Sequence, residues 1–142
     1  DPDAGKRVMP SEVATALREA LSQVVDAGTA KRVAGSFKLA DGTPLAMGGK
    51  TGTGDNRIEA IGSGGRILSS KAINRTATFV FYIGDHHFGT LTAFVPGASA
   101  QGFKFTSALP VQVLKGMAPI LTPYLQPGSN TLCQAPVASA AR

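Results

Sequence analysis

The chain has 142 residues and a net charge of +5, with 43% hydrophobic and 16% charged residues, which is the composition of one globular domain and excludes an intrinsically disordered chain. The basic residues are scattered, and no aromatic residues are interleaved with them, which argues against a nucleic-acid-binding protein. No apolar run approaches the roughly 18 residues of a membrane-spanning helix, and the single cysteine, Cys133, excludes an internal disulfide.

Apolar residues at helical spacing predict a first helix that begins near Pro10 and ends at Gly28. Pro10 suits the first turn because its missing N–H would be unpaired there in any residue. Gly28 is expected to end the helix as a left-handed cap. One side of this helix should carry the apolar stripe Val13, Leu17, Ala20, Leu21, Val24 and Val25.

The next part of the chain is rich in turn residues. The dipeptide Asp41-Gly42 predicts a turn. Residues 44–53 are predicted to be extended, with glycines that are tolerable where a ligand must approach the backbone closely. Residues 54–75 are predicted to be a long polar connection, and connections of that length inside a compact domain are usually functional or mobile.

Alternating side chains predict a central strand from Thr76 to Ile83, with both faces apolar enough to be covered. Residues 84–87 form the expected turn, and residues 88–95 return as the second strand of an antiparallel hairpin. Ser107 is expected to cap a final helix whose apolar face is Leu109, Val113, Leu114 and Met117. The sequence places the four phenylalanines of the hairpin in the core: Phe79, Phe81, Phe88 and Phe94.

This order of elements predicts an α+β fold in residues 1–125, with three antiparallel strands flanked by helices. Residues 126–142 are rich in Pro, Gly, Ser and Ala and are predicted to be a poorly ordered tail. Cys133 lies in that tail without a neighbouring base and is expected to be unreactive. His86 and His87 have no further His or Cys nearby, so neither a metal site nor a cofactor is expected.

Gly49-Lys50-Thr51 is compatible at first sight with a phosphate-binding loop. That motif needs a glycine five positions before Gly49, where this chain has Pro44. The dinucleotide-binding fingerprint fails as well, because Ile67 stands where the third glycine should follow Gly62-Ser63-Gly64.

A Lys-Thr-Gly triplet on a strand is also the third signature of serine acyl-enzyme penicillin-binding proteins and β-lactamases. Lysine sets a positive charge beside a substrate carboxylate, and threonine offers a hydroxyl to the same carboxylate. Glycine lets the substrate backbone lie against the strand. A backbone N–H just beyond can stabilise a developing oxyanion.

The sequence around the triplet strengthens this interpretation. The segments concerned are Gly28-Thr29-Ala30, Asp41-Gly42-Thr43-Pro44, Gly49-Lys50-Thr51-Gly52-Thr53, Asn74-Arg75-Thr76 and Tyr82-Ile83-Gly84. The run from about Met9 to Leu121 resembles the C-terminal part of the transpeptidase domain of large penicillin-binding proteins. It is most similar to the bifunctional kind that carries a glycosyltransferase domain upstream.

The resemblance implies D,D-transpeptidation, in which a D-Ala-D-Ala stem peptide transfers its acyl group to an amine and cross-links peptidoglycan. Lys50 would orient the substrate and tune the site electrostatically, and Gly52 would allow close backbone approach. Thr51 and Thr53 would bind the substrate carboxylate, and the Thr53 N–H would contribute to the oxyanion hole. The implied partners are stem peptides, β-lactams, a nucleophile-bearing upstream segment and a glycosyltransferase domain. The implied location is periplasmic, with the full-length protein anchored in the inner membrane.

The chain departs from the family in lacking Ser-x-x-Lys and Ser-x-Asn. Ser36-Phe37-Lys38 and Ser69-Ser70-Lys71 have the wrong spacing, because a nucleophile and its base one helical turn apart lie at i and i+3. Ser129-Asn130 lacks the intervening residue. Since these motifs precede Lys-Thr-Gly in the family, they are expected upstream of Asp1, and this chain alone is expected not to form an acyl-enzyme.

Two alternatives stay open. The first keeps the fold and changes the reaction to that of a D,D-carboxypeptidase or β-lactamase. The second is a non-catalytic module that binds a wall peptide or a protein through exposed sheet edges. Asp55, Asn56 and Arg57, just past the motif, either contact substrate or close the strand as a polar loop.

Overall fold

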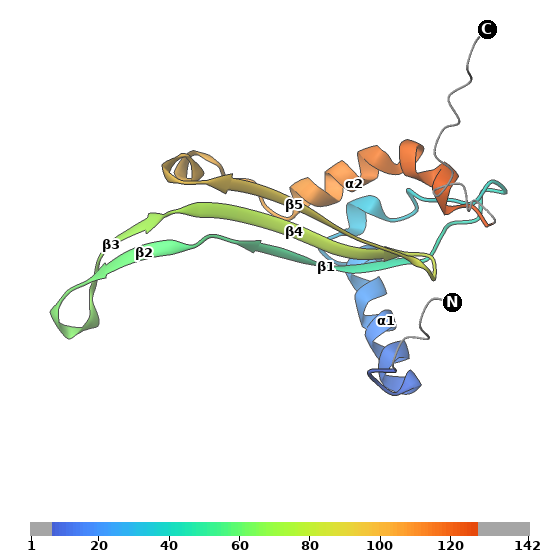
Figure 1. Cartoon of the computed structure of the whole chain (residues 1–142), viewed down its shortest axis with the longest axis horizontal. Helices are drawn as coiled ribbons and strands as arrows, with labels where there is room; N and C mark the ends of the chain where they lie inside the picture. The colour runs from blue at the N-terminus through green and yellow to red at the C-terminus, as the bar shows by residue number, and fades with distance from the viewer. Residues whose placement is uncertain (1–6, 128–142) are drawn as a thin grey trace, which may run out of the picture.

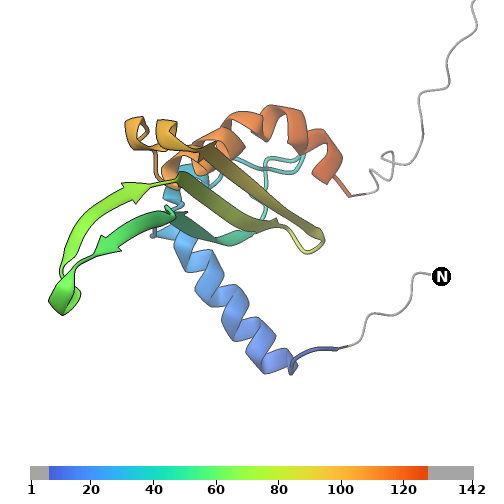
Figure 2. The same cartoon turned by 60° about the vertical axis from the view of Figure 1, so that its left-hand side comes forward.

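The computed structural model describes residues 7–127 and has the predicted α+β architecture. A three-stranded antiparallel sheet has the order β1-β4-β5, and helices α1 and α2 lie on opposite sides of it (Figures 1 and 2). The main elements are α1 (Ser11–Asp26), β1 (Met47–Gly54), β4 (Asn74–Ile83), β5 (His87–Pro96) and α2 (Ala108–Leu121). Within residues 7–127, no helix is long and apolar enough to cross a membrane.

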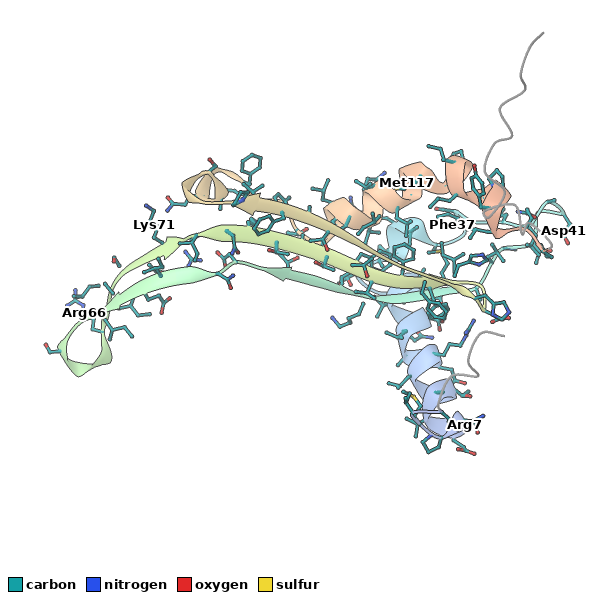
Figure 3. All side chains as sticks on the ribbon, in the orientation of Figure 1. Arg7, Phe37, Asp41, Arg66, Lys71 and Met117 are labelled. Atoms are coloured by element: carbon teal, nitrogen blue, oxygen red, sulfur yellow. The ribbon has the colours of Figure 1, made fainter. Side chains whose placement is uncertain are left out.

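The core lies between the sheet and α2. Phe79 and Ile83 of β4 point to this side and pack with Val111 and Leu114 of α2. Phe37 completes the cluster from beneath α2 and is fully buried (Figure 3). Residues 29–41 carried no periodic signal in the sequence, yet they contribute Phe37, Ala30 and Val33 to the core, the last from the short 3-10 helix η1 (Lys31–Val33).

The opposite face of the sheet is only half covered. Tyr82 is buried there, but Val80 on the same strand is 50% exposed, so the prediction that both faces are covered is wrong in part. The core assignments of Phe88 and Phe94 are wrong, because these side chains are 75% and 56% exposed on β5, whereas that of Phe79 is confirmed. Phe88 lies opposite Tyr82 and Phe94 opposite Thr76, so both rings are on this half-covered face of the sheet.

Helix α1 begins and ends near the predicted residues but is attached mainly through its C-terminal half. Val25 is the buried member of its apolar stripe. Arg18 ties the helix to the β4–β5 turn, since its guanidinium donates to Gly84 O at 2.8 Å and Asp85 Oδ1 at 2.7 Å. It also lies 4.5 Å from the centre of the Tyr82 ring.

Gly28 is not the left-handed cap that the sequence predicts, because its φ is not positive. The chain instead turns through Ala27, whose N–H bonds Gln23 O, and Ala30 N donates to Val24 O at 2.9 Å. A Cβ at position 28 would lie 2.9 Å from Val24 Cα. The glycine is therefore required for close packing on the last helical turn, not for its dihedral angles.

Residues 54–75 are not the long polar connection predicted from the sequence. They form β2 (Arg57–Ile61) and β3 (Ile67–Ala72), an antiparallel ribbon that continues β1 and β4 away from the body of the molecule (Figure 1). Every residue of the ribbon except Ala72 at its base is exposed. No buried face imposes an alternating apolar pattern on such a ribbon, so the ribbon was not predicted from the sequence.

The ends of the remaining elements differ in detail from the predictions. Ser107 stands at the N-cap of α2 as expected, but its side chain makes no capping bond, and Thr106 Oγ1 accepts from Ala108 N instead. Gln126, the first residue of the predicted tail, accepts a 2.9 Å hydrogen bond from Ala40 N. Residues 128–142, including Cys133, lie outside the described residues.

The turn predicted at Asp41-Gly42 is confirmed, with Gly42 at φ 87° and Asp41 Oδ1 accepting from Thr43 N at 2.8 Å (Figure 3). This hydrogen bond lowers the pKa of Asp41 below its ordinary value of 3.8. A lowered carboxyl pKa stabilises the turn above pH 3.8, and that contribution is lost as the pH falls through the folded-state pKa. We expect an NMR titration of the Asp41 carboxyl to have its midpoint below 3.8 and the Thr43 amide to shift with it. A Thr43 amide that ignores the Asp41 titration would contradict this.

Candidate functional site

The four residues of the Lys-Thr-Gly-Thr motif lie on β1, an outermost strand of the sheet. Among residues 7–127, β1 pairs only with β4, and its other edge faces no strand. In the antiparallel register Lys50 lies opposite Val80, and Thr51 lies opposite Phe79. Because successive side chains of a strand point to opposite faces, Lys50 is on the half-covered face of the sheet and Thr51 is on the core face, where it is 9% exposed.

The backbone groups of Thr51 and Thr53 face the open edge of β1. Gly84 N donates to Ala46 O at 2.7 Å, so this pair is hydrogen-bonded across the ladder. Hydrogen-bonded and non-hydrogen-bonded pairs alternate in an antiparallel ladder. The even-numbered residues of β1 therefore bond to β4, and the N–H and C=O groups of the odd-numbered residues point outward. The hydrogen bond from the Lys50 ammonium to Thr51 O, at 2.9 Å, is consistent with an outward Thr51 carbonyl.

Both threonine hydroxyls of the motif have partners within the protein. Thr51 Oγ1 lies 2.6 Å from Thr29 Oγ1, and either can be the donor. Thr53 Oγ1 accepts from Ser107 N at 2.8 Å, at the start of α2. A hydroxyl has one donor and two acceptor sites, so each keeps capacity for a further bond. The structure thus adds Thr29 and Ser107 to the site. In the sequence, Thr29 was noted only as part of a segment that accompanies the motif, and Ser107 only as a helix cap.

The glycines of β1 differ in what surrounds them. A Cβ at Gly49 would lie 2.3 Å from Val80 O and 2.7 Å from Phe79 Cε2, so this glycine is fixed by packing within the protein. A Cβ at Gly52 would meet no heavy atom within 4 Å. Gly54 at the end of β1 is equally open, so within the Lys-Thr-Gly-Thr motif Gly52 is the glycine that leaves room for an incoming chain. The sequence interpretation of a whole glycine-rich stretch shaped for a ligand therefore does not extend to Gly49.

The other candidates from the sequence lie around this strand or away from it. Asp55 and Arg57 follow β1 directly and are paired with each other, with Arg57 Nη1 at 3.1 Å from Asp55 Oδ2. His86 lies in the β4–β5 turn and His87 at the start of β5. Among residues 7–127, no group of three His, Cys, Asp or Glu side chains could hold a metal ion.

The hydrogen bond between Thr29 and Thr51 makes a prediction for Thr51→Val. Valine keeps the shape and burial of the side chain but removes the hydroxyl, and Thr29 is exposed enough to be solvated by water instead. We expect a loss of about 1 kcal/mol in the free energy of unfolding, measured by urea denaturation. Thr92→Val, at the exposed Thr78–Thr92 pair, is the matched control and should change stability by less than about 0.5 kcal/mol. Equal effects of the two substitutions would contradict a structural role for the Thr29–Thr51 contact.

The sequence matches no model of a known protein family and no curated protein.

Proposed function

We propose that this chain is part of a peptidoglycan D,D-transpeptidase and that β1 is the strand on which the acyl-donor peptide docks. The observation that carries the proposal is the open edge of β1, where the N–H groups of Thr51 and Thr53 point outward and Gly52 between them leaves room. An extended peptide adds to such an edge as a further strand, through main-chain hydrogen bonds.

The proposal assigns roles to the backbone and the side chains of the motif. The Thr53 N–H stabilises the negative charge that develops on the scissile carbonyl oxygen during acyl transfer. The second hydrogen-bonding site of the Thr51 and Thr53 hydroxyls binds the terminal carboxylate of the peptide. The Lys50 ammonium lies within reach of the same edge through its bond to Thr51 O, and it attracts that carboxylate.

The nucleophile comes from outside these 142 residues, because they contain no Ser-x-x-Lys. A β-lactam resembles the D-Ala-D-Ala end and acylates the nucleophilic serine of such enzymes, so a fluorescent penicillin reports an assembled site. The reaction places the whole protein on the periplasmic side of the inner membrane, and a glycosyltransferase domain in the same polypeptide would supply the glycan strands to be cross-linked.

The test uses fluorescent penicillin on the chain alone and on the chain joined to the upstream reading frame of its gene. The chain alone should not be labelled, and the longer protein should be. Lys50→Ala in the longer protein should slow labelling by about 100-fold or more, because it removes the cation beside the developing charges, whereas Lys115→Ala on α2 should label normally. Labelling of the isolated chain, or normal labelling of the Lys50→Ala protein, would contradict the proposed roles.

A D,D-carboxypeptidase or β-lactamase on the same fold would also bind penicillin. These activities are separated by the fate of the acyl group, which is transferred to an added amine in a transpeptidase and to water in the other two. A longer protein that releases only hydrolysed product in the presence of acceptor amine would favour the hydrolase. A longer protein that is not labelled at all would favour the non-catalytic binding module, for which the edge of β5 is a second available surface.

A further inference from the structure

A basic hollow of about 350 Å³ lies beyond the end of β1. Its cationic lining residues are Arg57, Arg75 and Lys104, and its one acidic lining residue is Asp55. The volume falls within the range of small-ligand sites in proteins. Three cations with one anion leave an excess of positive charge in a partly enclosed space, where opposite charge is attracted more strongly than on an open surface.

The arginines of the hollow are held in place by the protein. Arg75 Nε donates to Phe105 O at 2.8 Å, and its guanidinium carbon lies 5.7 Å from the centre of the Phe105 ring. Arg57 is held by Asp55 and by Ser70 Oγ, which accepts from Arg57 Nε at 3.0 Å. Behind Ser70 stands Glu59, which accepts from its hydroxyl at 3.2 Å.

Donor groups are left over for a ligand. Within residues 7–127, the terminal nitrogens of Arg75 and the ammonium of Lys104 make no hydrogen bond to the protein. A guanidinium fixed through its Nε presents its two terminal nitrogens as a fork that matches a carboxylate. The fixed orientation reduces the entropy that is lost when an anion binds.

The register places this hollow close to the motif. Asp55 is two residues past Thr53, and Arg75 is two residues before Ala77, the β4 partner of Thr53. Two residues of extended chain span about 7 Å. A peptide that lies along β1 with its scissile carbonyl at the Thr53 N–H can therefore bring a side chain two residues away to the hollow.

We infer that the hollow binds a second carboxylate of the acyl-donor peptide, carried about two residues before the scissile bond. The inference rests on the proposed function for the identity of the peptide. It makes the hollow a specificity site that selects acidic donor peptides over their amidated forms.

The test compares two peptides on the ¹⁵N-labelled 142-residue chain, acetyl-Glu-Ala-D-Ala-D-Ala and acetyl-Gln-Ala-D-Ala-D-Ala. At low salt the Glu peptide should bind about tenfold more tightly and should shift the Nε–H signals of Arg57 and Arg75, which the Gln peptide should leave in place. Lys104→Gln and Arg75→Gln should each reduce this preference. Arg66→Gln, which removes the same charge at the distant tip of the β2–β3 ribbon (Figure 3), should keep it. Lys104 is exposed and makes no hydrogen bond or ion pair within residues 7–127, so the result for Lys104→Gln tests the inference if Arg75→Gln is unstable.

The failure of this inference differs from that of the proposed function. Equal binding of both peptides, with unchanged Nε–H signals, would overturn the specificity site and leave the docking strand intact. Binding by neither peptide would count against the docking strand. A titration with glutarate alone then tests whether the hollow binds an anion. Glutarate shifts at Arg57 and Arg75 that are lost in Lys104→Gln would support an anion site, and their absence would overturn it.

Discussion

Phe37→Ala is expected to lower the free energy of unfolding by about 3–5 kcal/mol, the largest stability effect that we expect from a single substitution in this chain. Phe37 is completely buried. It belongs to the core cluster of the described residues, together with Val33, Met47 and Leu114. Alanine would leave a cavity there, because the surrounding sheet and α2 can close over it only in part. Urea unfolding followed by circular dichroism measures the change.

The matched control is Phe88→Ala. This ring is 75% exposed on β5, so its loss removes little burial and should cost less than about 1 kcal/mol. Similar losses for the two substitutions would show that residues 29–41 do not pack against the sheet as described.

Gly49→Ala is expected to destabilise the fold by about 3 kcal/mol, because the new Cβ would lie 2.3 Å from the Val80 carbonyl oxygen, a backbone atom that cannot move alone. Gly52→Ala, three residues along the same strand, meets no atom within 4 Å and should fold with nearly unchanged stability. For peptide binding, in contrast to stability, the proposed docking makes Gly52 important. Gly52→Ala should weaken the binding of a D-Ala-D-Ala peptide about tenfold, which corresponds to about 1.4 kcal/mol.

Thermal unfolding and peptide titration of both variants separate these effects. A stable Gly49→Ala chain would show that β1 is not packed against Phe79 in the described register. A Gly52→Ala chain that binds peptide as well as the unmodified chain would show that the peptide does not pass over this position.

The sequence predicted those parts of the fold in which burial imposes a pattern. The hairpin of β4 and β5 and the two helices were predicted because their apolar residues recur with the period of a strand or a helix. Phe37 was missed as a core residue because it lies in an irregular segment, where burial is set by tertiary contacts alone. The β2–β3 ribbon was missed for the opposite reason, since its exposed faces require no apolar alternation.

The candidate site was predictable in its residues but not in its geometry. The motif placed Lys50, Thr51, Gly52 and Thr53 on one strand, and the strand is present. That this strand lies at the edge of the sheet, with the Thr53 N–H outward, depends on its pairing with β4, which no local pattern encodes. The contacts of Thr51 with Thr29 and of Thr53 with Ser107 join segments 22 and 54 residues apart.

The proposed function requires a D-Ala-D-Ala peptide to bind along the outer edge of β1. The most direct measurement is a titration of the ¹⁵N-labelled chain with acetyl-Gln-Ala-D-Ala-D-Ala, followed through its backbone amide signals. We expect the largest shifts at the Thr53 and Thr51 amides, with little change at Thr90 and Thr92 on β5. Largest shifts on β5, or no shift at Thr53 at saturating peptide, would contradict it.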